Sequence, residues 1–136
     1  MLSVLAPKSA SQVMQIAVPE AMYEENDGSD YLLSTPLFDK YNSLAIGPGM
    51  GQYVESIPIL RAALQCRLPI VIDADALNLL AGHRALLDLL HDKCLLTPHE
   101  GEFKRLVGKW ANETERMEKL HQFSKQYGCT VLLKGP

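Results

Sequence analysis

Short hydrophobic runs alternate along the chain with longer segments in which apolar residues recur at helical spacing. The short runs are rich in Ile, Val and Leu, and they predict strands at residues 3–5, 21–25, 43–46, 70–72, 94–96 and 130–133. The longer segments predict helices at residues 9–18, 53–65, 77–90, 98–107 and 112–127. Because strands and helices alternate, the pattern favours an α/β fold with a mostly parallel sheet, helical cover and right-handed crossovers.

The run Ile70-Val71-Ile72 is the clearest strand, since three consecutive β-branched residues are typical of a strand buried on both faces. It ends at Asp73, and Asp75 is predicted to cap the helix that follows. In open α/β sheets, ligands bind at the edge where strands end and helices begin. We therefore expect Asp73 to face a cleft at that edge, while the alternative is that the carboxylates serve only the helix start.

Two further helix starts carry capping signals. Ser9 with Gln12 predicts a capping box for the first helix. Thr97 is predicted to cap a later helix, with Pro98 at its first position and Glu100 completing the box.

Composition narrows the class of protein. The chain has 136 residues, enough for one domain with a core, and 47% of them are hydrophobic while 21% are charged. The net charge of −3 gives no electrostatic reason to expect nucleic acid or an anionic membrane as a partner. No apolar run reaches the roughly 20 residues of a membrane helix, and no signal peptide is evident. Three widely spaced cysteines predict reduced core thiols in the cytoplasm.

A glycine-rich loop, Gly47-Pro48-Gly49-Met50-Gly51, lies between a predicted strand and a predicted helix. Glycines there let backbone N–H groups approach a ligand, and the helix that follows favours an anion such as a pyrophosphate. The alternative is a tight turn without a ligand.

The segment that begins at Thr97 carries a second candidate site. His99 lies in the first predicted helical turn, and Glu102 lies three residues later on the same side. Gly101 between them suggests that something packs closely against this turn. A carboxylate at a helix start can hold hydrated Mg²⁺ near phosphates, while the alternative is a capping box with a solvated face. Lys134 follows the last strand and would present an ammonium group to phosphate at the same edge, unless it is simply solvated.

Four segments, taken together and in their order along the chain, indicate one protein family. The sequence resembles the ADP- or ATP-dependent NAD(P)H-hydrate dehydratases of the ribokinase-like superfamily. The resemblance spans essentially the whole chain and depends on AIGPGMG, VIDADALNLL, LLTPHEGEFKRL and TVLLKG at residues 45–51, 71–80, 95–106 and 130–135. It implies a three-layer αβα fold and a lyase that phosphorylates the hydroxyl of a hydrated nicotinamide and then eliminates phosphate.

The resemblance also implies roles for individual residues. The implied contacts with NAD(P)H hydrate come from Gly47, Gly49, Gly51, Asp73, Asn78 and His99. The implied nucleotide and phosphate contacts come from Glu102, Lys134 and Gly135, with Glu102 also holding Mg²⁺ through water. His99 stands where the superfamily motif has Asn, which favours ADP over ATP as the phosphoryl donor.

The chain departs from the family pattern at both ends. The Gly-Thr-Gly-Asp motif, which supplies the catalytic aspartate, and the first glycine-rich strand are absent, so residues 1–136 are expected to be a partial, truncated dehydratase domain with no assigned catalytic base. A small-molecule kinase acting on a vitamin alcohol and a non-catalytic nucleotide-binding module are the alternatives. The resemblance leaves open a homo-oligomer and a coupling to an NAD(P)H-hydrate epimerase.

Overall fold

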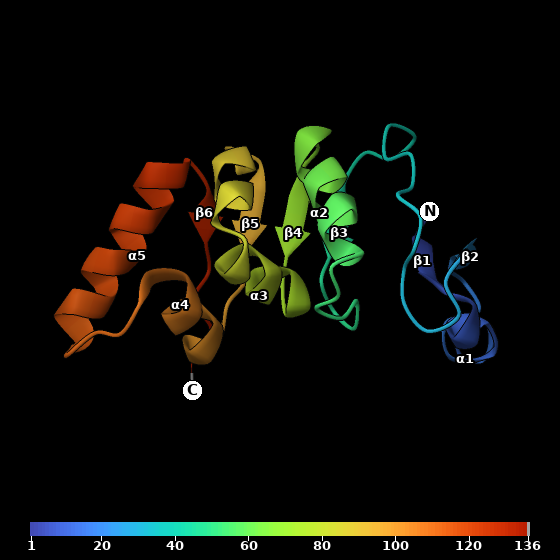
Figure 1. The fold of residues 1–136 in the computed structure, drawn as a ribbon, viewed down its shortest axis with the longest axis horizontal. Helices are drawn as coiled ribbons and strands as arrows, with labels where there is room; N and C mark the ends of the chain where they lie inside the picture. Colours follow the sequence, from blue (N-terminus) through green and yellow to red (C-terminus); the bar gives the residue numbers. More distant parts are fainter. Residues whose placement is uncertain (136) are drawn as a thin grey trace.

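The computed structural model describes residues 1–135, which form strands and helices in alternation (Figure 1). The strands are β1 Ser3–Pro7, β2 Met22–Asn26, β3 Leu44–Ile46, β4 Ile70–Ile72, β5 Cys94–Leu96 and β6 Thr130–Val131. The α-helices are α1 Ser11–Ala17, α2 Ser56–Gln65, α3 Asp75–Gly82, α4 Glu100–Val107 and α5 Glu113–Tyr127. Two 3₁₀ helices, η1 Lys8–Ala10 and η2 Arg84–Leu89, complete the set.

All strand pairs are parallel, as the sequence predicts. The strands form two sheets, one with the order β1-β2 and one with the order β3-β4-β5-β6. In the larger sheet Ile46 lies opposite Ile72, and Ile72 lies opposite Leu96, so the three strands end at the same level. The β1-β2 sheet lies beside the β3 end of the larger sheet (Figure 1).

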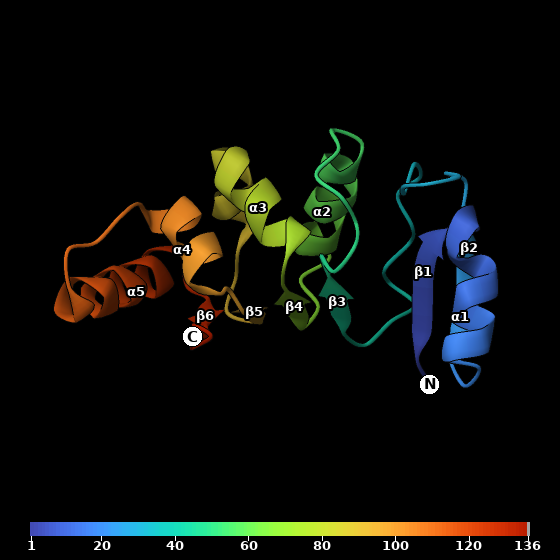
Figure 2. The same ribbon diagram turned by 90° about the horizontal axis from the view of Figure 1, so that it is seen from below.

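Helices cover one face of the larger sheet. Ile70 and Ile72 are 2% and 0% exposed under this cover, whereas Val71 between them is 38% exposed. Figure 2 shows α2 and α3 on one side of β3, β4 and β5, with no helix of residues 1–135 on the other side. The expectation that β4 is buried on both faces is therefore wrong. Residues 1–135 thus supply two of the three expected layers, the sheet and one layer of helices. The side chain of Val71 is exposed because it points to the sheet face that these helices do not cover.

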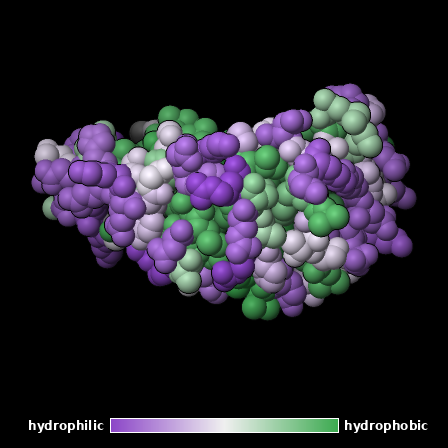
Figure 3. Space-filling model, turned by 90° about the horizontal axis from the view of Figure 1, so that it is seen from above, coloured by the Kyte–Doolittle hydropathy of each residue, from purple (hydrophilic) through white to green (hydrophobic). Residues whose placement is uncertain are grey.

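The core lies between this sheet and its helices. Its members are fully or nearly buried apolar side chains, among them Leu60, Leu64, Ile72, Leu77, Leu80, Leu86 and Leu96. The predicted helical segment 77–90 divides at Gly82 into α3 and η2. Figure 3 shows hydrophobic residues gathered near the middle of the molecule and hydrophilic residues over the end formed by α5. No described helix is long and apolar enough to cross a membrane.

The first helix differs from its prediction. It begins at Ser11 after η1, and its N-cap residue is Ala10, so no side chain caps the helix. The predicted capping box of Ser9 and Gln12 is therefore wrong. The backbone N–H of Ser9 instead donates to the carbonyl of Ser29, which fixes Ser9 before the helix starts.

The cysteines match the expectation of unbridged thiols. Cys94 and Cys129 are buried, Cys66 is half-buried, and all three are free. Burial raises the pKa of the Cys94 thiol, and burial together with the neighbouring Cys94 raises the pKa of Cys129 to about 11. Thiols with raised pKa values stay protonated and unreactive at neutral pH.

Candidate functional site

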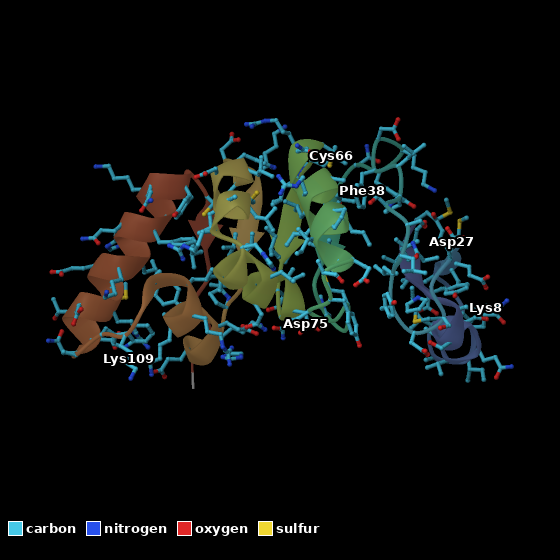
Figure 4. All side chains as sticks on the ribbon, in the orientation of Figure 1. Lys8, Asp27, Phe38, Cys66, Asp75 and Lys109 are labelled. Atoms are coloured by element: carbon cyan, nitrogen blue, oxygen red, sulfur yellow. The ribbon has the colours of Figure 1, made fainter. Side chains whose placement is uncertain are left out.

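The loops that follow β3, β4, β5 and β6 lie at one edge of the sheet. Backbone hydrogen bonds join them in series: Asp73 N–H donates to the Ile46 carbonyl at 3.1 Å, and Thr97 N–H donates to the Ile72 carbonyl at 3.1 Å. Lys134 N–H donates to the Pro98 carbonyl at 2.9 Å and so ties the last segment to the loop after β5. The side chain of Asp75 marks this edge in Figure 4. The predicted convergence of these segments on one edge of the sheet is confirmed.

The glycine-rich loop is packed against the segment that follows β4. Gly47 has φ of +127°, and a Cβ there would lie 1.7 Å from the carbonyl oxygen of Asp73, so no other residue fits without displacing the backbone. Gly49, with φ of +68°, has no atom within 4 Å of its Cβ position. Packing therefore accounts for Gly47, while Gly49 lies beside open space that could admit a ligand.

Asp73 is paired with Lys134, which lies 61 residues away in sequence. The distance from Lys134 Nζ to Asp73 Oδ1 is 2.7 Å. Burial alone raises the pKa of the Asp73 carboxyl, but hydrogen bonds from Lys134, the Ala74 backbone and Thr97 outweigh it and lower the pKa below its usual value. Two predicted site residues thus meet as an ion pair, and Lys134 is not the simply solvated lysine of the alternative reading.

Asp75 does not cap its helix as predicted. The N-cap position of α3 is Ala74, which makes no side-chain cap, and it adopts φ of +50° and ψ of −122°. This turn directs Asp75 to the glycine-rich loop, where Oδ2 accepts the Gly51 N–H at 3.0 Å and Oδ1 accepts Gln52 Nε2–H at 3.1 Å. A non-glycine residue at positive φ costs about 1–3 kcal/mol and persists where the surroundings hold it. The carboxylate of Asp75 therefore braces the glycine-rich loop.

His99 and Glu102 form a reciprocal capping box at the start of α4. Nδ1 of His99 accepts the N–H groups of Gly101 and Glu102 at 3.0 and 3.3 Å, and Glu102 Oε2 accepts the His99 N–H at 2.9 Å. A Cβ on Gly101 would lie 2.9 Å from the His99 ring, which explains the glycine between them. The predicted cap at Thr97 with Glu100 is therefore wrong by two residues, because the helix starts later.

The capping box leaves the imidazole of His99 available. Its side chain is 55% exposed, whereas that of Glu102 is 7% exposed. Because Nδ1 accepts hydrogen bonds, the proton of the neutral ring lies on Nε2, which is 3.2 Å from Glu102 Oε1. Both ring nitrogens thus face protein groups, and the exposed ring of His99 can stack against a ligand at this edge.

Within residues 1–135 no group of three or more His, Cys, Asp or Glu side chains could hold a metal ion. Mg²⁺ commonly retains several waters and is bound by one or two carboxylates together with substrate phosphates. Glu102 fits that role only through water, because both of its oxygens already face His99.

A hollow of about 440 Å³ lies next to the glycine-rich loop and is lined by Gln52, Asn78, Ala81, Gly82 and Arg105. Of these, only Asn78 is expected from the sequence. Its Oδ1 accepts Arg105 Nη1–H at 3.0 Å, and its Nδ2 donates to the Ala74 carbonyl at 3.3 Å. Sequence reasoning missed Gln52, Asp75 and Arg105 as site residues. The position of Gln52 directly after the loop, and that of Arg105 three residues after Glu102, were signals that could have identified two of them.

Comparison with known proteins identifies the family. The NAD(P)H-hydrate dehydratase family matches residues 1–136. The bifunctional NAD(P)H-hydrate repair enzyme Nnr of Moorella thermoacetica is 34% identical over 137 residues, covering 97% of this chain and 25% of that protein. The Nnr enzyme of Methanopyrus kandleri is 33% identical over 132 residues, covering 95% of this chain and 24% of that protein.

Solved structures have the same fold. A ribokinase-like superfamily protein from Enterococcus faecalis superposes with a TM-score of 0.77 at 23% identity, covering 98% of this chain and 46% of that chain. The ADP/ATP-dependent NAD(P)H-hydrate dehydratase of Bacillus subtilis, co-crystallised with ATP/Mg²⁺, superposes with a TM-score of 0.65 at 26% identity. The match covers 95% of this chain and 45% of that chain. The chain spans about a quarter of these curated relatives and just under half of these solved structures. The chain belongs to the NAD(P)H-hydrate dehydratase family and has a ribokinase-like α/β fold.

Proposed function

We propose that this chain contributes the substrate-binding edge of an ADP-dependent (S)-NAD(P)H-hydrate dehydratase, a lyase of nicotinamide nucleotide repair. Membership of the family supports the reaction. The convergence of four loops on one edge of the sheet is the observation that supports the site. In the proposed reaction the terminal phosphoryl group of the nucleotide passes to the ring hydroxyl. Phosphate then leaves with the hydroxyl oxygen, and the ring loses a proton to restore the reduced nicotinamide.

The hydrated dinucleotide is proposed to lie against the glycine-rich loop. Gly49 is the proposed point of close approach, because open space lies beside it. Gly47 and Gly51 are proposed to shape the loop around the ligand, since Gly47 packs on Asp73 and the Gly51 N–H is held by Asp75. His99 contributes an exposed imidazole from the neighbouring loop. Phosphoryl transfer needs positioning and charge neutralisation more than covalent chemistry from the protein, and groups of this kind supply both.

The phosphates of the nucleotide are proposed to contact Lys134 and Gly135, with Glu102 ordering hydrated Mg²⁺. Lys134 is held by Asp73 at 2.7 Å, so a phosphate would share or replace that carboxylate as its partner. When bound, Mg²⁺ would neutralise phosphate charge. ADP is the proposed donor and ATP the alternative, and co-crystallisation of the Bacillus subtilis dehydratase with ATP/Mg²⁺ supports nucleotide and metal use in the family.

The setting of the protein is also a proposal. The free cysteines support a reducing, cytoplasmic location. The relatives named as bifunctional repair enzymes support coupling to a second activity, for which we propose NAD(P)H-hydrate epimerase. Self-association into a homo-oligomer is part of the same proposal.

Titration of the chain with hydrated NADH, followed by amide NMR, tests the binding proposal. His99→Asn keeps a good helix cap while removing the imidazole ring. We expect it to weaken hydrate binding by up to about tenfold, because an aromatic stacking contact is worth about 0.5–1.5 kcal/mol. His121→Ala, an exposed histidine on α5, is the matched control and should leave the affinity unchanged.

A turnover assay distinguishes the reactions. With ADP and Mg²⁺ added, a protein that includes this chain should restore the absorbance of reduced nicotinamide. A stable phosphorylated product would instead identify a small-molecule kinase, and ADP binding without hydrate binding would identify a nucleotide-binding module. Either result would overturn the proposed function.

A further inference from the structure

The hollow beside the glycine-rich loop is built from three separate elements. Gln52 comes from the segment before α2, Asn78 and Gly82 come from α3, and Arg105 comes from α4. Its volume of about 440 Å³ is ample for a phosphate group, and the hollow is open to solvent. Because Gln52 directly follows Gly51, a ligand that lies on the loop can extend into the hollow without leaving the surface.

Arg105 brings a positive charge to the hollow, and its guanidinium is not paired with a described carboxylate. Its only side-chain hydrogen bond among residues 1–135 goes to the amide oxygen of Asn78, and it forms no ion pair with a described residue. The Asp75 carboxylate accepts its hydrogen bonds from Gly51 and Gln52 and not from Arg105. By contrast, Lys104 on the same helix pairs with Glu100 at 2.7 Å. A guanidinium has five donors, so Arg105 retains most of them for an anion.

We propose that this hollow receives the ribose 2′-phosphate that distinguishes NADP from NAD, with Arg105 as its main contact. The inference depends on the proposed function, since it assumes that the hydrated dinucleotide lies on the glycine-rich loop. Arg binds phosphate through paired N–H donors and accommodates a 2′-phosphate in other dinucleotide sites. The side-chain amides of Gln52 and Asn78 supply further hydrogen bonds, so the site favours the phosphorylated hydrate.

The test compares the affinities of the chain for hydrated NADPH and hydrated NADH by titration calorimetry. We expect the unmodified chain to bind hydrated NADPH more tightly. Arg105→Gln should weaken hydrated NADPH about ten- to a hundredfold, the worth of hydrogen bonds to a charged group, and leave hydrated NADH unchanged. Lys104→Gln, which removes the neighbouring cation on the same helix, is the control and should preserve the preference.

A second variant fills the hollow without disturbing the core. A Cβ on Gly82 meets no atom within 4 Å, so Gly82→Leu places a side chain in open space. Because glycine weakens a helix, its replacement should not destabilise the fold. It should abolish the preference for hydrated NADPH while the unfolding midpoint stays equal or rises. Equal affinities in the unmodified chain, or a preference that survives both variants, would overturn this inference alone. Failure of the chain to bind either hydrate would overturn the proposed function and the inference with it.

Discussion

The edge of the β3–β6 sheet and the unit formed by β1, β2 and α1 have similar sequence signals but different surroundings. Both alternate a hydrophobic run with an amphipathic segment and a capping signal. In α3 the apolar residues are buried, with Leu80 at 0% exposure, whereas α1 has no buried residue and Ile16 is 82% exposed. An amphipathic pattern therefore predicts that a helix forms, but neighbouring elements decide whether its apolar face is buried.

The two regions also hold their loops differently. At the large sheet, polar side chains reach across from one loop to the next, as Asp75 does to Gly51 and Lys134 does to Asp73. In the smaller unit, Glu24 on β2 accepts hydrogen bonds from Lys40 and Tyr41 of the segment that leads away to β3. The first network binds loops at a shared edge, and the second secures a connection between sheets.

The largest expected contrast is between an apolar helix residue of each region, one buried and one exposed. Leu80→Ala should reduce the free energy of unfolding by about 4 kcal/mol, because it removes buried methyl groups and leaves a cavity. Ile16→Ala should change it by less than about 0.5 kcal/mol, since the side chain lies in solvent. Urea denaturation of the two variants measures both values. A large loss for Ile16→Ala would mean that α1 is covered in solution and would remove the contrast.

An intermediate effect is expected inside the glycine-rich loop. Gly47→Ala places a methyl group against the carbonyl of Asp73 and should cost about 2–3 kcal/mol of unfolding free energy. Gly49→Ala meets open space and should cost about 1 kcal/mol, from its positive φ alone. Thermal unfolding ranks the two, and equal losses would show that the loop does not pack on Asp73 as described.

The smallest effect concerns the two ion pairs. The pKa of the Asp73 carboxyl is lowered by hydrogen bonds that outweigh its burial, so its stabilising effect is present above its unfolded pKa and is lost as the pH falls through the lower folded value. Lys134→Met should raise that pKa toward the ordinary aspartate value and cost less than about 1 kcal/mol at neutral pH, because both groups are partly exposed. Carboxyl NMR titration measures the shift.

Lys40→Met is the counterpart in the smaller unit. The hydrogen bond from Lys40 is the main cause of the lowered pKa of Glu24, with Tyr41 second, so this variant should raise the pKa of Glu24 and leave Asp73 unaffected. A response of Asp73 to Lys40→Met would show that the two networks are coupled.

Local sequence signals located the strands, but they placed helix caps less well. Thr97, Pro98 and Glu100 match a capping box as closely as His99 and Glu102 do, and the structure uses the second pair. Both sets offer suitable side chains within a few residues of each other. The choice depends on how far the loop after β5 must travel before α4 can pack, which is a property of the whole fold.

Some residues of the candidate site could likewise be predicted from the sequence, and others could not. The glycine-rich loop, Asp73, His99, Glu102 and Lys134 were predicted from the chemistry expected where strands end, and the structure places them along one edge. Asp75 and Arg105 escaped prediction because their partners, Gly51 and Asn78, lie 24 and 27 residues away. No local pattern indicates contacts at that separation.

The sequence by itself determined the parallel α/β architecture, because hydrophobic period and glycine position are local properties that follow from backbone geometry. It also indicated which segments follow the strand ends and so meet at one edge of the sheet. Only the tertiary structure decided which carboxylate caps, which braces the glycine-rich loop and which guanidinium faces an open hollow. These outcomes depend on hydrogen bonds between distant segments, whose partners are chosen when the sheet assembles and brings its strand ends together.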